Sequence, residues 1–393
     1  MKIFKNYINK ILVSTILGGL CFALSSCSDD NNSPENGVAD TTVLVYAIAT
    51  NSLSSNLVSD KNEMIKAAAD IDLRKNNILV FETKYDPSDR SKSIISLLKL
   101  VKTNESFGWE TVKEYSNDLE PLDPSRITEV INYVTKNFES KNKGLVFWSH
   151  STGSQPYLSS RSDDKLAYSF GQDQTASTAN AQINVDVLAD AVPDGMFDYI
   201  WFDSCYMGNI ETLYEFRNKC NLYVGYPTEV LEYGLPYDMV LPYLVGPHPD
   251  IIYAAELFYK YYQNSKATIA VINMNNIEDF AKDCRNIFSG ENNVNTFGFM
   301  KYTRSTTGPF YELGDYAKEV ARVSDRSISD ENWNSILEKI VLYKASTKRD
   351  FSESLIVPER YSGISAHVYS FGNDSNNEIY YKSLDWYKDV FAL

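Results

Sequence analysis

Basic residues and histidine are scarce in this chain of 393 residues, which holds 37 Lys and Arg residues, 52 Asp and Glu residues and three histidines. The net charge of -15 at neutral pH opposes binding to nucleic acid and to anionic membranes, because both are negatively charged. Cysteine is also sparse, with five residues, and no Cys or His residues have the short spacing of a structural zinc site. No calcium-ligand loop is recognisable. The residues themselves therefore predict no metal and no cofactor.

Long apolar runs are missing except at the N-terminus. There, three lysines precede "ILVSTILGGLCFAL", a pattern typical of an export signal and too short to favour a spanning helix. Leu24–Cys27 resembles a bacterial lipobox, which implies that residues 1–26 are removed and that Cys27 is lipidated. A plain signal peptide or a membrane anchor is the alternative. The "SDD" after Cys27 resembles the surface-export signal of Bacteroidetes lipoproteins, so we expect an exported protein, anchored by lipid at the outer membrane or cell surface.

The rest of the chain alternates between strand-like and helix-like stretches. Residues 27–40 are polar and predict a disordered tether. From residue 41, apolar runs of strand length alternate with amphipathic helical patterns, which predicts an α/β domain with a mostly parallel sheet. We divide this domain into a core at about 41–245 and a C-terminal α/β part at about 246–393. In such sheets, ligands bind outside the carboxyl ends of the strands.

Two side chains follow strongly apolar strands, where such a ligand site would form. His150 ends "GLVFWSH" and Cys205 ends "FDYIWFDSC". An imidazole beside a thiol can lower the thiol pKa and shuttle its proton, as a cysteine nucleophile requires. The other reading, a buried inert thiol and an isolated polar histidine, is about as well supported by composition alone. Of the remaining residues of these types, Cys220 and Cys284 are expected to be structural thiols, and His248 and His367 occupy a loop and a strand.

The stretch "FDSCYMGNIETLYEF", from Phe202 to Phe216, resembles the nucleophile motif of clostripain-family cysteine peptidases. "LVFWSHSTG" resembles the strand that ends in the catalytic histidine of that family, and "GYPTEVLEYGLPYD", "YELGDYA" and "YSGISAHVYS" resemble further segments. The resemblance covers most of the chain from about residue 42. It implies a caspase/gingipain-like three-layer αβα sandwich and endopeptidase activity on peptide or protein substrates.

The resemblance also implies roles for individual residues. Cys205 corresponds to the nucleophile and His150 to the general base and acid. The backbone N–H groups of Cys205 and Ser151 correspond to the oxyanion hole. Asp203 corresponds to an acid of the S1 pocket, although a strand-end cap or a packing residue is the alternative. Clostripain itself requires calcium, so calcium is expected only by this resemblance.

Two positions depart from the family pattern. Ser151 stands where the family usually has glycine, so its side chain could crowd the oxyanion site. Tyr233 stands where enzymes with Arg/Lys specificity place a second acid, and the neighbouring Glu232 need not face the pocket. A strict preference for a basic P1 residue is therefore in doubt, and Tyr233 is expected to contact substrate. The second hypothesis for function is a catalytically silent surface lipoprotein that uses this fold for binding.

The stretch from Ser151 to Ala181 is long and polar, and it lies between the histidine and the cysteine. A loop of this length in a compact domain is usually functional. It contains Arg161 and Lys165, and relatives are cleaved in this region. We therefore expect self-cleavage here, with an ordinary surface loop as the alternative.

Overall fold

The computed structural model describes residues 37–154, 170–176, 181–288, 293–302, 310–369 and 376–392. The leader, Cys27 and the expected cleavage residues Arg161 and Lys165 lie outside these ranges. Ala39 and Asp40, which we expected to belong to the tether, lie in the first strand. Within the described residues, no helix is long and apolar enough to cross a membrane.

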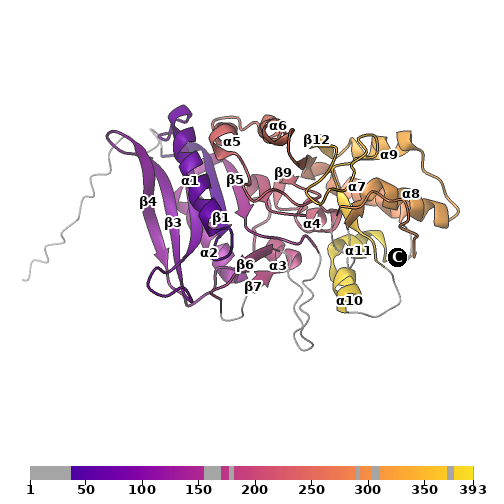
Figure 1. Cartoon of the computed structure of the whole chain (residues 1–393), viewed down its shortest axis with the longest axis horizontal. Coiled ribbons are helices and arrows are strands. Elements are labelled where there is room, and N and C mark those ends of the chain that lie inside the picture. The colour runs from indigo at the N-terminus through magenta and orange to yellow at the C-terminus, as the bar shows by residue number, and fades with distance from the viewer. Residues whose placement is uncertain are drawn as a thin grey trace, which may run out of the picture. The chain divides into compact units, whose positions relative to one another are not determined.

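A nine-stranded sheet with the order β12-β10-β9-β8-β5-β1-β2-β3-β4 forms the centre of the described chain (Figure 1). Its five middle strands, from β9 to β2, are parallel to one another. The strands of this sheet are β1 Ala39–Ile48, β2 Asn76–Tyr85, β3 Ser93–Lys102, β4 Phe107–Tyr115, β5 Ser140–Trp148, β8 Phe197–Asp203, β9 Cys220–Gly225, β10 Thr268–Asn273 and β12 Val341–Ser346.

Antiparallel strands extend both edges of the sheet. On one side, β3 and β4 form an antiparallel hairpin, and β3 pairs with β2. On the other side, β10 pairs antiparallel with both β9 and β12. Two small sheets pair β6 Phe170–Asp173 with β7 Ala181–Ile183, and β11 Phe310–Glu312 with β13 Ser365–His367. The first of these belongs to the stretch that we expected to be a loop.

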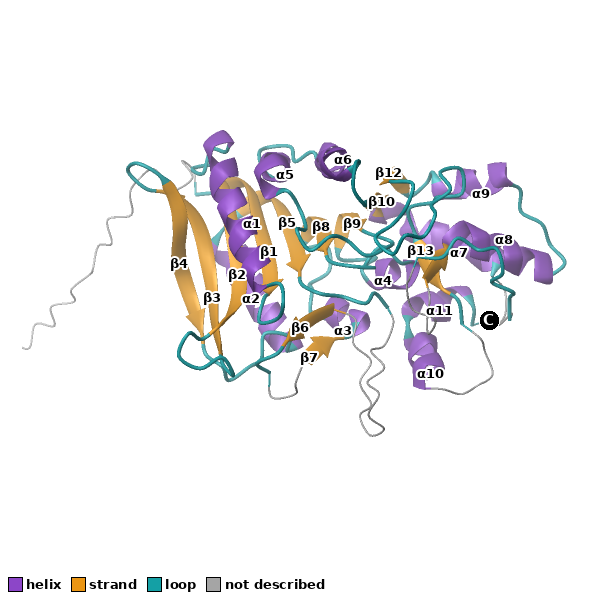
Figure 2. Cartoon of the chain, viewed as in Figure 1, coloured by secondary structure: helices purple, strands orange, loops and turns teal. Residues whose placement is uncertain are grey.

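Helices cover both faces of the sheet (Figure 2). They are α1 Ser54–Ala67, α2 Pro124–Asn137, α3 Val185–Asp190, α4 Ile210–Glu215, α5 Tyr237–Leu244, α6 Ile251–Tyr262, α7 Ile277–Ile287, α8 Leu313–Val323, α9 Asp330–Leu337, α10 Asn376–Ser383 and α11 Asp385–Val390. Short 3₁₀ turns occupy Ala68–Asp70 and Met274–Asn276.

Strand β1 shows how the two layers of core arise. Its side chains alternate between faces, because successive residues of a strand point in opposite directions. Leu44, Tyr46 and Ile48 pack in the cluster that includes α2, α3, α4 and the C-terminal helices. Val43 and Val45 pack in the opposite cluster, with α1, α5 and α6. Since both faces are covered, the strand is an unbroken apolar run from Val43 to Ile48, as expected for a parallel sheet.

The observed architecture confirms the predicted fold class, an α/β sandwich around a mostly parallel sheet. The division near residues 245 and 246 stays a prediction. The strands β10 and β12 follow that point in sequence and belong to the same sheet as the core.

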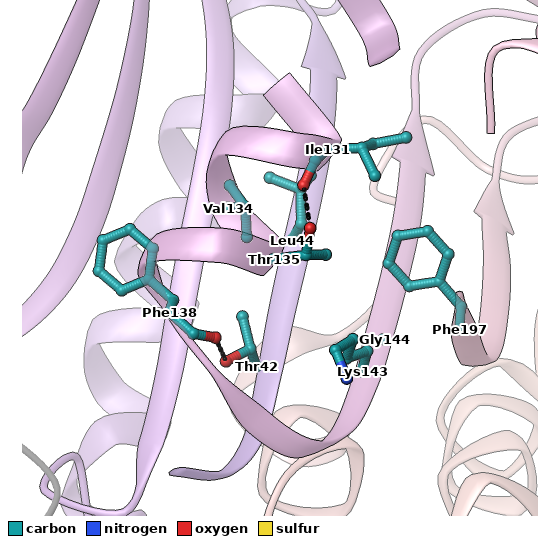
Figure 3. A pocket seen from close by; sticks show the side chains of 9 residues that line it. All are labelled: Thr42, Leu44, Ile131, Val134, Thr135, Phe138, Lys143, Gly144 and Phe197. Atoms are coloured by element: carbon teal, nitrogen blue, oxygen red, sulfur yellow. Dashed lines mark hydrogen bonds between the residues drawn. The ribbon is translucent and has the colours of Figure 1, made fainter. Parts of the chain in front are cut away.

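A small cavity lies near the amino ends of β1, β5 and β8, beside the last turns of α2 (Figure 3). Its volume is about 10 Å³, close to the smallest space that can hold one water molecule. The hydroxyl groups nearby are already used, since Thr42 donates to the Phe138 carbonyl and Thr135 to the Ile131 carbonyl. This cavity is a packing gap and offers no chemistry.

Candidate active site

The carboxyl ends of β5 and β8 place His150 and Cys205 at the same edge of the sheet. The two strands are paired in parallel, and their last partners are Trp148 and Asp203. His150 and Cys205 each lie two residues beyond this pair, so the two segments leave the sheet in matching register. Both residues line one cavity of about 470 Å³.

Segments after four neighbouring strands enclose this cavity. Strands β2 and β5 lie on opposite sides of β1, so the strand order reverses there. Open α/β sheets bind ligands at such a reversal of strand order. The lining residues are Leu53, Trp148, Ser149, His150, Asp203, Ser204, Cys205, Glu229, Val230, Leu231, Glu232, Tyr233, Gly234 and Phe351.

The Cys205 thiol is held by the backbone of Val230. Its Sγ lies 3.5 Å from the Val230 N–H, which donates to it, and 3.8 Å from the Val230 carbonyl oxygen. Burial raises the Cys205 pKa to about 12, and the Val230 N–H opposes this shift only partly. The cysteine is therefore a neutral thiol in this conformation. The expected lowering of its pKa by an imidazole is absent here.

A sharp turn follows the cysteine. Tyr206 has φ of 59°, a left-handed conformation that costs a residue with a side chain of this size on the order of 1–3 kcal/mol. The Tyr206 N–H donates to the Thr228 carbonyl at 2.9 Å, and the Tyr206 ring stacks on Phe310 with centroids 5.6 Å apart. These contacts hold the strained turn and direct the chain from β8 toward α4.

The His150 ring is fixed by the segment that follows β1. Its Nε2 lies 2.9 Å from the Ser52 hydroxyl, which leaves Nδ1 as the nitrogen available for chemistry. The His150 carbonyl accepts from the Gly171 N–H at 2.9 Å. Burial lowers the His150 pKa, so this ring is neutral near pH 7. The thiol and the imidazole thus both rest uncharged.

Ser151 connects the two strand exits. Its hydroxyl donates to the Cys205 carbonyl, so the side chain that replaces the usual glycine has a defined partner. Among the described residues, the backbone N–H groups of Ser151 and Cys205 donate to no other residue.

Asp203 brings a buried carboxyl to the cavity. Its Oδ2 accepts from the Leu235 N–H at 3.1 Å and from the Tyr237 hydroxyl at 3.2 Å. Its Oδ1 is buried and has no hydrogen-bond partner in the described part of the chain. Burial raises the Asp203 pKa to about 7. An unpartnered carboxylate oxygen of this kind is costly unless a ligand supplies a donor.

Tyr233 and Glu232 lie at the outer part of the cavity. The Tyr233 side chain is 63% exposed, and the Glu232 side chain is exposed while its carbonyl accepts from Asn56 at 2.9 Å. Gly234 follows with φ of +56°, and its Cα passes so close to Asp203 that a Cβ would lie 2.7 Å from Oδ2. Neither Tyr233 nor Glu232 therefore supplies a second acid at the position of Asp203.

The other cysteines and histidines lie apart from this site. Cys220 and Cys284 are buried free thiols, and burial raises both pKa values. His248 is exposed, whereas His367 is buried and its pKa is lowered to about 3 by that burial. Among the described residues, no group of three or more His, Cys, Asp or Glu side chains could hold a metal ion.

Sequence reasoning missed two residues near the site, Ser52 and Asp60. Ser52 forms a hydrogen bond with His150, and the Asp60 carboxyl group accepts from the indole N–H of Trp148 at 2.8 Å. Neither belongs to a recognisable motif. The only signal in the sequence was their position: both residues follow β1, whose carboxyl end lies beside that of β5.

A mostly parallel sandwich with a cysteine and a histidine at its carboxyl edge defines the class of cysteine-type peptidases with a caspase-like fold. The chain belongs to the clostripain family, whose model matches residues 45–391. No curated protein matches the chain.

Three solved structures share this architecture. An inactive zymogen C11 protease from Parabacteroides distasonis is 26% identical, with a TM-score of 0.73, and the match covers 90% of this chain and 99% of that one. A secreted C11 cysteine protease from Bacteroides thetaiotaomicron in complex with an irreversible peptide inhibitor is 24% identical, with a TM-score of 0.73 and coverage of 89% and 98%. Another secreted C11 cysteine protease from that organism, "iotapain", is 20% identical, with a TM-score of 0.69 and coverage of 90% and 99%.

Proposed function

We propose that the chain is an exported endopeptidase in which Cys205 is the nucleophile and His150 is the general base and acid. One observation carries this proposal: the two side chains leave paired strands in matching register and line the same cavity. Family membership makes the chain a cysteine-type peptidase, and no other cysteine of the described residues lines this cavity.

The geometry supports a two-step hydrolysis. His150 Nδ1 accepts the thiol proton while Cys205 Sγ forms a bond to the scissile carbonyl carbon. The N–H groups of Cys205 and Ser151 donate to the oxygen that becomes negative. The imidazolium then protonates the departing amine, which leaves an acyl-enzyme. A water molecule, deprotonated by His150, hydrolyses this thioester and restores the thiol.

Ser52 stabilises the charged form of the histidine in this sequence of steps. When Nδ1 takes the proton, Nε2 also carries one, and the Ser52 oxygen at 2.9 Å can accept it. Because both groups rest neutral, proton transfer must accompany attack on the bound substrate. Contact with substrate must also free Cys205 from Val230.

We further propose that Asp203 forms the floor of the S1 pocket and binds an Arg or Lys side chain at P1. The free Oδ1 supports this assignment, since a guanidinium or ammonium group would satisfy it and favour the ionised carboxylate. Tyr233 contacts the substrate nearer the pocket entrance. Because only Asp203 contacts the P1 side chain at this floor, the preference for a basic P1 residue is weaker than in a pocket where two acids contact it.

Labelling and hydrolysis test the proposal together. Cys205→Ala is expected to abolish cleavage of a diverse peptide library and labelling by an iodoacetamide-type probe, whereas Cys220→Ala keeps both. In the free wild-type protein, labelling should accelerate with pH well above pH 8, because the thiol pKa is raised. Labelling or cleavage that survives in Cys205→Ala would exclude this cysteine as the nucleophile.

Anchoring and processing complete the proposal. The lipobox-like sequence supports lipidation of Cys27, which predicts that a clickable palmitate analogue labels the exported protein and that Cys27→Ser prevents this. The polar stretch between the histidine and the cysteine supports self-cleavage there. A protein that stays single-chain while fully active on a peptide would contradict that second part.

A further inference from the structure

Two more carboxyl groups lie behind Asp203. Asp60 and Glu63 project from α1 and lie three residues apart, which places them on one face of the helix. Asp60 is only 2% exposed, and its Oδ2 accepts from Trp148, which lines the cavity beside His150. Asp203 acts electrostatically on Asp60, and so does Glu63.

Tyr237, at the start of α5, connects these acids. Its N–H donates to Glu63 Oε2 at 3.0 Å, and its hydroxyl donates to Asp203 Oδ2 at 3.2 Å. The hydroxyl of Tyr262, from α6, donates to the carbonyl of Gly234 at 2.8 Å beside Asp203. These tyrosines are neutral, because burial raises their pKa values far above 10.

No positive charge of the described chain balances Asp60 or Asp203. No Lys or Arg acts on Asp60 or Asp203, while Glu63 senses Asp238 and Lys66. Two further ionisable neighbours of Asp203 are Tyr226 and Cys205, and burial raises both pKa values, so both groups are neutral. The free Oδ1 of Asp203 provides independent evidence that a donor from outside belongs here.

We propose that Asp60 is a specificity-determining residue, a reserve carboxyl group that is protonated in the empty S1 pocket and ionises when a basic P1 side chain docks at Asp203. This proposal rests on the proposed function. On docking, the O–H bond of Asp60 breaks, the proton passes to solvent, and the new carboxylate shares the positive charge of the ligand with Asp203. Trp148 donates to Asp60 in both states.

The ionisation order of the two acids gives the proposal a measurable signature. Burial raises the Asp203 pKa to about 7, whereas burial and the charge of Asp203 together raise the Asp60 pKa to about 9. Asp203 therefore ionises first. A cation beside both groups favours the second ionisation, so attraction for a basic P1 residue grows in two steps as pH rises.

The test compares kcat/KM for two peptides that differ only in arginine or citrulline at P1, between about pH 6 and pH 9.5. Citrulline has the shape of arginine without its charge. Because both peptides use the same nucleophile, their ratio cancels the titration of Cys205 and His150. In the wild-type enzyme, the Arg/citrulline ratio should rise through about pH 7 and continue to rise toward pH 9.

Asp60→Asn should keep the first rise and lose the second, because an amide still accepts from Trp148 but cannot ionise. Near pH 9 its ratio should be about tenfold below that of the wild type, the factor that corresponds to one pKa unit of interaction, while the two ratios agree near pH 6. Glu215→Gln is the matched control, since it removes a buried carboxyl whose pKa is about 7 and which lies outside this cavity. Its profile should match the wild type.

A binding measurement avoids dependence on the Asp60 variant. Calorimetry of Cys205→Ala with the arginine peptide, in two buffers of different ionisation enthalpy at about pH 8, should show net proton release. A wild-type ratio that is flat above about pH 8, or binding without proton release, overturns the role of Asp60. If Asp60→Asn lowers the Arg/citrulline ratio by the same factor at all pH values, Asp60 has a structural role, and that result also overturns the proposal. Absence of any Cys205-dependent cleavage instead overturns the proposed function.

Discussion

At the scale of single residues, Gly234 limits the shape of the proposed S1 floor. Its φ of +56° suits glycine, and a Cβ would lie 2.7 Å from Asp203 Oδ2. Gly234→Ala is therefore expected to displace the Asp203 carboxylate. The loss of this charge-assisted contact should lower kcat/KM for a P1-arginine peptide at least about tenfold, mainly by raising KM. Steady-state kinetics with the arginine and citrulline peptides measure this effect.

Gly195→Ala is the matched control. Gly195 has φ of +60° with nothing within 4 Å of an added Cβ, so it carries the same backbone cost, about 1 kcal/mol or more, without contact with the site. Equal kinetics in the two variants would show that Asp203 does not depend on the close approach of Gly234.

At the scale of secondary-structure elements, the contact between β5 and β8 sets the positions of both proposed catalytic residues. Gly144 pairs with Tyr199 in this register, and a Cβ at Gly144 would lie 2.1 Å from the Tyr199 ring. That ring is buried, and its hydroxyl donates to the Leu244 carbonyl at 2.7 Å. Gly144→Ala should therefore destabilise the protein by about 1–3 kcal/mol through overpacking and reduce kcat, since β5 ends next to His150.

Denaturant unfolding and peptide kinetics check this expectation together. Gly108→Ala provides the comparison, because Gly108 lies in the edge strand β4 with open space around it. It should leave both stability and activity near wild-type values. If Gly144→Ala behaves like Gly108→Ala, the close packing of β5 on β8 is not what fixes the site.

The same elements show what a sequence can and cannot predict. The strands that end in His150 and Cys205 were predictable, because buried parallel strands are short apolar runs and a polar residue at the end of one is conspicuous. Helix α5 was not predicted, since Pro242 lies within it and proline argues against a helix interior. Asp60 was also missed, because it meets Trp148 only through the packing of α1 against the sheet. Contacts of this kind leave no local pattern.

At the scale of the whole molecule, the number of buried acids predicts how stability depends on pH. Among the described residues, burial is the largest cause of raised pKa values at seven carboxyl groups: Asp60 to about 9, Asp203 to about 7, Glu211 to about 8, Glu215 to about 7, Glu312 to about 7, Asp350 to about 6, and Glu63, whose pKa is also raised. In the unfolded chain such groups have pKa values near 4.

The sign of the effect follows from where the protons are bound. Between about pH 4.5 and pH 8, the folded state holds protons on these groups that the unfolded state has released, so the free energy of unfolding falls as pH rises. His367 and His150 act in the opposite direction, because burial lowers both pKa values, that of His367 to about 3. Their contribution is lost as pH falls below about 6.5. Since seven carboxyl groups oppose two histidines, the Tm should be several degrees higher near pH 5 than near pH 8.

Calorimetric melting curves across this range, at constant ionic strength, measure the expected decline in Tm. One variant tests whether the buried carboxyl groups cause this decline. Glu211 accepts from the His367 N–H at 3.0 Å, a bond that a glutamine carbonyl can keep. Glu211→Gln should therefore remain folded and lose Tm less steeply between pH 5 and pH 8. Glu105→Gln, at an exposed position, should reproduce the wild-type slope. A Tm that rises from pH 5 to pH 8 would mean that these carboxyl groups are ionised in the folded protein, and the protonated reserve acid proposed beside Asp203 would then lose its physical basis.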